Sequence, residues 1–240
     1  MSDFLIDNRS ALTNLLELTA AITGLLLLEK YKFSTAKFFI WFLVYIFICE
    51  SLGIFHSISV DNGGVLSFLQ ETVLYENYWY YTIFWKIGAI VFIAFYYHRI
   101  LEASLFKFIA KVSGLVFLIF SLIHIIFNLD DYFITFLPAI SVFGAVVVFI
   151  VTVLYFIELL LSDRILSFYR SLNFYITFTI FIWWLIITPL VFYDIYMSND
   201  DSTFTTLRIK IYLFANIFIY TMYTIALIFC VPKEHHKIKS

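Results

Sequence analysis

Seven apolar runs, each about as long as a bilayer is thick, constrain this chain more than any other feature. A transmembrane helix needs about 20 predominantly apolar residues. The sequence predicts such helices at roughly 10–28, 38–57, 78–98, 108–128, 134–160, 172–194 and 209–231. The run at 144–151 does not alternate in polarity, as strands of a membrane barrel would. The predicted fold is an all-α, polytopic bundle of seven transmembrane helices.

Composition agrees with this fold class. The chain is 63% hydrophobic and only 13% charged, whereas a soluble domain is about a quarter charged. The seven runs use most of the 240 residues, so a single transmembrane domain over 1–240 is predicted. The lipid bilayer is the expected surrounding, and no nucleic-acid partner is expected.

The basic residues predict the orientation of the bundle. The loops on one side hold only Arg9, Arg208 and Lys210. The loops and tail on the other side hold Lys30, Lys32, Lys37, Arg99, Lys107, Lys111, Arg164, Arg170, Lys233, Lys237 and Lys239. Cytoplasmic loops are enriched in lysine and arginine, so the N-terminus is predicted outside and the C-terminus in the cytoplasm.

Three charged residues lie inside the predicted spans. With a rise of about 1.5 Å per residue, Glu17, Glu50 and Lys86 all lie roughly 10–12 Å inward from the outer surface. A charge at mid-bilayer costs roughly 3 kcal/mol even on the lenient insertion scale, and such residues normally face a partner or a cavity. Consecutive helices usually pack side by side. The sequence therefore predicts an ammonium between two carboxylates, as either a structural ion pair or a ligand or ion site.

Further polar residues share helical faces with these charges. Asn14 lies on the stripe of Glu17 at helical spacing, and the last predicted helix carries Asn216 and Tyr220 on one stripe. Together they predict a cavity open to the outside. The predicted ligand or ion site comprises Glu17, Glu50, Lys86, Asn14, Asn216 and Tyr220. The histidines do not form an HxxxH or HxH pair within the spans, so neither a metal nor a cofactor is predicted, and no residue is assigned a catalytic role.

One internal similarity bears on the topology. The segment 84–87, Phe-Trp-Lys-Ile, aligns with 214–217, Phe-Ala-Asn-Ile, and both lie in predicted helices that run inward. A 3+1+3 pseudo-repeat with the fourth helix as linker would give this pattern, and such repeats place binding sites at their interface. A chance match between two apolar helices would give it as well.

Several short motifs resemble a known group of proteins. They are Glu17-x-x-Ala-Ala-Ile-x-Gly24, Lys30-Tyr31, Trp41-Phe-Leu-x-Tyr45 leading to Glu50-x-x-Gly53, Asn77-Tyr-Trp79 and Tyr155-Phe-x-Glu158. The chain resembles uncharacterised seven-helix integral membrane proteins of Bacteroidetes. The resemblance implies a multi-pass protein of the bacterial inner membrane and a signalling protein as an expected partner. It implies no activity and no catalytic residue.

Three functions remain open from the sequence. The first is a sensor or accessory subunit that binds a small ligand from outside and acts on a separate cytoplasmic partner. The second is a proton-coupled small-molecule transporter that uses the same charges. The third is an intramembrane enzyme acting on lipid, with His56, His124 or Asp194. Glu158, near the cytoplasmic end of its helix, is predicted to reach the interface as a structural residue.

Overall fold

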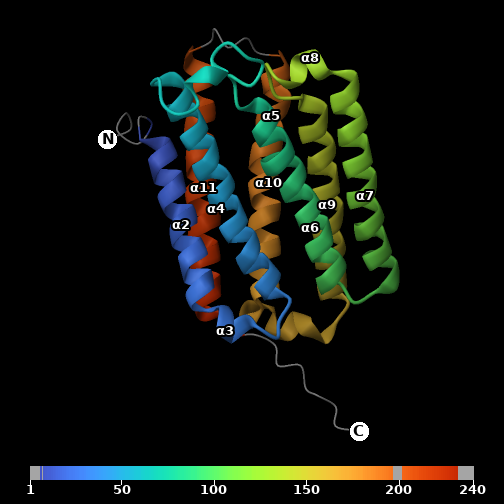
Figure 1. The fold of residues 1–240 in the computed structure, drawn as a ribbon. Coiled ribbons are helices and arrows are strands. Elements are labelled where there is room, and N and C mark those ends of the chain that lie inside the picture. The colour runs from blue at the N-terminus through green and yellow to red at the C-terminus, as the bar shows by residue number, and fades with distance from the viewer. Residues whose placement is uncertain (1–5, 7, 197–201, 232–240) are drawn as a thin grey trace.

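The protein is a bundle of long helices arranged side by side (Figure 1). The computed structural model describes residue 6 and residues 8–196 and 202–231, and this part contains no strand. The long helices are α2 (Arg9–Leu26), α4 (Ala36–Asp61), α6 (Gly88–Ile100), α7 (Ser104–Phe127), α9 (Pro138–Leu160), α10 (Leu172–Tyr196) and α11 (Ser202–Phe229). The short ones are α3 (Leu28–Tyr31), η1 (Ser67–Leu69), α5 (Tyr78–Tyr80), η2 (Tyr81–Ile87), α8 (Leu129–Tyr132) and η3 (Asp163–Arg170).

Six helical segments of the described residues are long and apolar enough to cross a membrane. They are Ala36–Asp61, Tyr78–Ile100, Ser104–Phe127, Pro138–Leu160, Leu172–Phe192 and Phe204–Phe229. The second of them is continuous through α5, η2 and α6. The remaining long helix, α2, has 18 residues, and Arg9, Asn14 and Glu17 make it more polar. It lies in the bundle beside α4 and α11. The structure thus establishes an all-helical protein with six membrane-compatible helices.

The helices form a ring in which chain neighbours are not always spatial neighbours. α2 packs between α4 and α11, α10 packs between α11 and α9, and α6 and α7 pack on α9 and on each other. Small residues allow these close contacts. A Cβ added at Gly24 of α2 would lie 3.0 Å from the Ile40 side chain of α4. Because α2 packs on α11, helices from the two ends of the chain lie side by side.

The span Tyr78–Ile100 contains a rare backbone form near its start. Residues Tyr81–Ile87 form the π-helix η2, which connects α5 to α6. π-Helical segments inside α-helices are frequently found at functional sites. Because their hydrogen bonds run from residue i to i+5, they break the α-helical spacing by which side chains are assigned to faces. Lys86 lies within this segment.

The end of α11 is held by α3. The Tyr31 hydroxyl donates to the carbonyl oxygens of Leu227 and Cys230, both at 2.9 Å. The Lys30 ammonium donates to the carbonyls of Leu227 and Ile228. These bonds satisfy carbonyls that lack partners at a helix C-terminus, where a cation is also favoured. Burial raises the pKa of Tyr31, so its hydroxyl stays a donor. The motif Lys30-Tyr31 is therefore a helix-end clamp.

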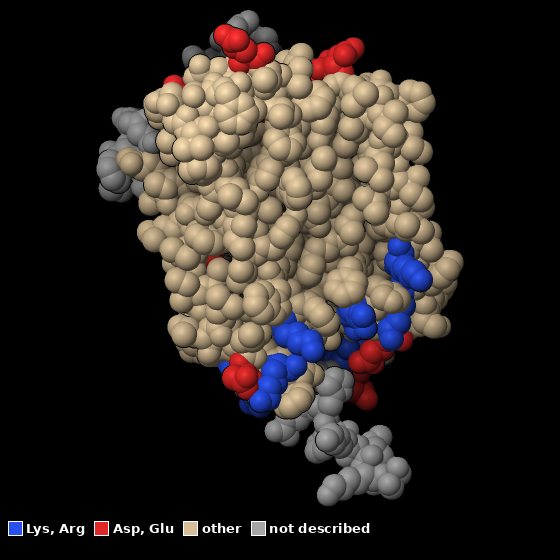
Figure 2. Space-filling model, in the orientation of Figure 1, with Lys and Arg blue, Asp and Glu red and all other residues tan. Residues whose placement is uncertain are grey.

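The charged residues lie mainly at the two ends of the bundle, and the two ends differ in their basic residues. Figure 2 shows lysines and arginines gathered at the lower end, where Figure 1 places α3, with some acidic residues among them, while the charged residues visible at the upper end are acidic. The helices between the two ends present an almost uncharged surface on this face. Exposed side chains on the helix surfaces include Leu52, Ile126 and Phe149. This distribution suits a protein whose sides contact lipid.

Candidate functional site

A polar cavity lies between the start of α2, the C-terminal half of α4, η2 and the start of α11. Its volume is about 310 Å³. The residues lining it are Arg9, Ser10, Thr13, Asn14, Glu50, Ile54, Tyr81, Arg208, Ile209, Tyr212, Leu213 and Asn216. These residues come from four segments that are far apart in the chain. The cavity exists because the ring brings α2 next to α11 and η2 next to α4.

Three of the six predicted site residues line this cavity: Asn14, Glu50 and Asn216. The hydroxyl of Tyr81 donates to Glu50 Oε2 at 3.1 Å. The Asn14 amide nitrogen donates to Ser51 Oγ at 3.0 Å. The Asn216 amide oxygen accepts from Trp183 Nε1 at 3.1 Å. These neighbours fix the orientation of each polar group at the cavity wall.

Two more predicted residues lie beside the cavity, inside the bundle. Glu17 is only 2% exposed and Tyr220 is 8% exposed. The Tyr220 side chain is a hydrogen-bonding neighbour of the Glu17 carboxylate, which also lies within electrostatic range of Glu50. Glu17 Oε2 is buried and has no hydrogen-bond partner. Burying a polar group without a partner is unfavourable, so this oxygen is an unusual feature of the core.

Lys86 faces another part of the bundle. Its ammonium donates to Ser141 Oγ of α9 at 2.9 Å and lies 4.1 Å from the ring centroid of Phe136. In the described part of the chain the ion pairs are Lys32–Glu29, Arg164–Glu102 and Arg164–Glu158. The predicted ammonium bridge from Lys86 to Glu17 or Glu50 is therefore wrong. The π-helix breaks the α-helical spacing on which that prediction depended, and α6 packs on α9.

Lys86→Met and Glu50→Gln are expected to act independently on stability. Residues without shared partners have additive effects, whereas residues in contact couple by about 0.5–3 kcal/mol. The double variant should therefore lose the sum of the two single losses, within about 0.5 kcal/mol. Thermal unfolding of the four proteins in one detergent measures the coupling. A larger coupling energy would mean that Lys86 and Glu50 do interact, as the sequence predicted.

Sequence reasoning missed part of the cavity wall. Arg9 and Arg208 entered the argument only as loop charges, yet both line the cavity. Tyr81 was not among the predicted site residues, yet its hydroxyl bonds Glu50. A signal was present in the last helix, where Arg208, Tyr212 and Asn216 recur at intervals of four and so share one face.

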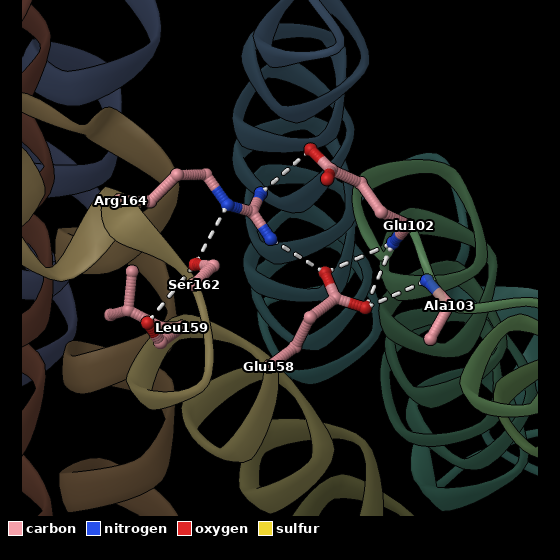
Figure 3. A network of polar contacts seen from close by, with 6 residues as sticks. All are labelled: Glu102, Ala103, Glu158, Leu159, Ser162 and Arg164. Carbon is pink, nitrogen blue, oxygen red and sulfur yellow. Dashed lines mark hydrogen bonds and ion pairs between the residues drawn. The ribbon is translucent and has the colours of Figure 1, made fainter.

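A second polar cluster lies at the opposite end of the bundle (Figure 3). Glu158 of α9 accepts hydrogen bonds from the backbone nitrogens of Glu102 and Ala103, at the start of α7, over 2.9–3.0 Å. Arg164 of η3 donates to Glu158 at 2.8 Å and pairs with Glu102 at 3.0 Å. An anion at a helix N-terminus is favoured by the helix dipole. Glu158 is thus a structural residue that holds two loops together, and its contact with the membrane interface stays a prediction.

The other candidate groups stay apart. His56 Nε2 lies 3.1 Å from the Leu74 carbonyl, and His124 contacts Asn128. The side chain of Asp194 lies outside the described residues. Within the described ranges, groups of three or more potential metal ligands do not occur. The lipid-modifying site considered from the sequence, which includes Asp194, therefore stays a prediction.

Comparison with known protein families, with curated proteins and with solved structures finds no match. The class of the protein is therefore defined by its own fold and site. In the part of the chain that the structure describes, it is all-helical, with six helices long and apolar enough to cross a membrane and a polar cavity at one end of the bundle.

Proposed function

We propose that this chain is a small-ligand sensor or accessory subunit of the bacterial inner membrane. In this proposal α2 is a seventh span, the N-terminus is outside, and the cavity opens outward. A ligand that enters the cavity acts through the helices on a separate cytoplasmic signalling protein. The observation that carries the proposal is the cavity itself, about 310 Å³ in volume and lined by polar residues of α2, α4, η2 and α11.

The packing inward of the cavity favours binding over passage. Ala20, Ala21, Ile40 and Leu43 are at most 3% exposed, and Leu227 is fully buried. These residues belong to one continuous apolar core. A substrate that entered the cavity would have to separate α2, α4 and α11 to continue inward. A ligand that only binds needs no such opening.

A proton-coupled transporter is the second candidate. It is favoured by the carboxylates of Glu17 and Glu50, which lie within electrostatic range of each other, because neighbouring carboxylates can share a proton. In that case, proteoliposomes should accumulate a substrate when a pH gradient is imposed, and Glu50→Gln should abolish accumulation. Uptake that needs no protein partner would favour the transporter over the sensor.

Single cysteines test the orientation and the seventh span. Ser10→Cys should react with a membrane-impermeant maleimide in intact spheroplasts, whereas Lys32→Cys and Leu166→Cys should react only after permeabilisation. The two native cysteines, Cys49 and Cys230, are buried, so they give a low background. Equal labelling of Ser10→Cys and Lys32→Cys in intact spheroplasts would mean that α2 does not cross.

The function itself is tested on the intact particle. The protein is purified gently from its own membrane and analysed by native mass spectrometry. A co-purifying cytoplasmic protein together with a bound small molecule is the expected result. The control is Asn216→Leu, which replaces a polar group of the cavity wall with an apolar one. This variant should lose the small molecule and keep the protein partner. A lone chain with neither component would contradict the sensor.

A further inference from the structure

We propose, on the basis of the ligand-binding function above, that the cavity recognises the ammonium group of a small monoamine. The ammonium would lie against Glu50 and Asn14, at the side of the cavity next to Glu17. The inference depends on the charge and the hydrogen-bonding capacity of the partly buried Glu50 and Asn14 and of the buried Glu17.

The first argument is charge. Glu50 lines the cavity while Glu17 is 2% exposed beside it, and the ion pairs of the described residues include neither carboxylate. A buried charge is strongly unfavourable unless it is paired. A cationic ligand at Glu50 would supply the missing charge.

The second argument is hydrogen bonding. Tyr81 occupies only Oε2 of Glu50, which leaves Oε1 as an acceptor. The Asn14 nitrogen is already bonded to Ser51, which leaves the Asn14 carbonyl oxygen as an acceptor. Glu17 Oε2, buried beside them, has no hydrogen-bond partner. An ammonium has three donors and no acceptor, so its chemistry complements this set of oxygens.

The third argument is the size and lining of the cavity. A volume of about 310 Å³ greatly exceeds what a bare metal cation or a proton needs. Tyr81 and Tyr212 line it, and tyrosine rings attract organic cations. Arg9 and Arg208 also line it and would repel a second positive charge. The ligand is therefore an amine with a single ammonium and a neutral or anionic remainder, rather than a polyamine.

The test compares three two-carbon probes of similar size in purified protein reconstituted in nanodiscs. Ethanolamine carries an ammonium, ethylene glycol is neutral, and glycolate is an anion. Binding is followed by tryptophan fluorescence, because Trp183 bonds Asn216 at the cavity wall. We expect ethanolamine to bind and the other two probes to show no saturable change over the same concentrations.

Variants complete the test. Glu50→Gln and Asn14→Ala should each weaken ethanolamine binding, Glu50→Gln by about tenfold or more, which corresponds to about 1.4 kcal/mol. Asn14→Ala keeps the test decisive if Glu50→Gln does not fold. The control, Glu29→Gln, changes an exposed glutamate paired with Lys32 and should leave the dissociation constant unchanged.

The outcomes separate the two proposals. Preferential binding of glycolate or ethylene glycol, or unchanged ethanolamine binding in both cavity variants, would overturn the ammonium inference. A non-amine molecule in the native particle that is lost in Asn216→Leu would also overturn it, yet leave the sensor intact. The absence of any small molecule, together with the absence of binding by all three probes, would overturn both proposals.

Discussion

Glu158→Ala is expected to lower the free energy of unfolding by about 2–4 kcal/mol. The carboxylate accepts bonds from two backbone nitrogens and from Arg164. Its removal would leave these donors without an acceptor in a largely buried place, and each unsatisfied donor costs about 1–3 kcal/mol. The 10% exposure of the Glu158 side chain means that little water can replace it. Thermal unfolding in one detergent, with tryptophan fluorescence as the signal, measures the loss.

Glu102→Ala is the matched control. Glu102 pairs with the same guanidinium, but its side chain is 70% exposed, and exposed ion pairs contribute about 0–1 kcal/mol. The backbone nitrogen of Glu102 that bonds Glu158 is kept in this variant. We expect the control to lose at most about 0.5 kcal/mol. Equal losses in the two variants would mean that the surface ion pair, and not the bonds to the backbone, holds the two loops.

The long helices could be predicted because apolar length alone specifies them. The spans predicted at 38–57 and 78–98 correspond to Ala36–Asp61 and Tyr78–Ile100. The span predicted at 134–160 begins later, because Pro138 occupies the first position of α9, where proline is favoured. The short helices α3 and η3 were not predicted, since neither contains an apolar run of spanning length.

Site residues could be predicted from the sequence only where they lie in regular α-helices. Asn14 and Glu17 on α2, and Asn216 and Tyr220 on α11, lie in regular helices, and each pair reaches the region of the cavity. Lys86 lies in a π-helix, which a hydrophobic pattern does not reveal. The role of Glu158 depends on backbone donors more than 50 residues away, so only the packed structure identifies them.

Gly53→Ala is expected to disrupt the cavity, with a loss of about 2–4 kcal/mol. A Cβ at this position would overlap the Tyr81 hydroxyl and lie 2.5 Å from Cζ of its ring. Overpacking costs about 1–3 kcal/mol, and moving Tyr81 would also break its bond to Glu50. Hydrogen bonds to charged groups contribute about 1.5–3 kcal/mol. Thermal unfolding should show the loss, and ligand binding should weaken in parallel because Glu50 is no longer held.

The same substitution should reverse its sign when the tyrosine ring is absent. In a Tyr81→Ala background the three atoms nearest to the added methyl group, all from the Tyr81 ring and hydroxyl, are absent, and alanine is favoured over glycine in a helix by about 1 kcal/mol. We therefore expect Gly53→Ala to be neutral or stabilising there, compared with Tyr81→Ala alone. A loss of the same size in both backgrounds would place the clash elsewhere on α4. The reversal would show that the absence of a side chain at Gly53 lets Tyr81 reach across to Glu50, and that this contact shapes the cavity.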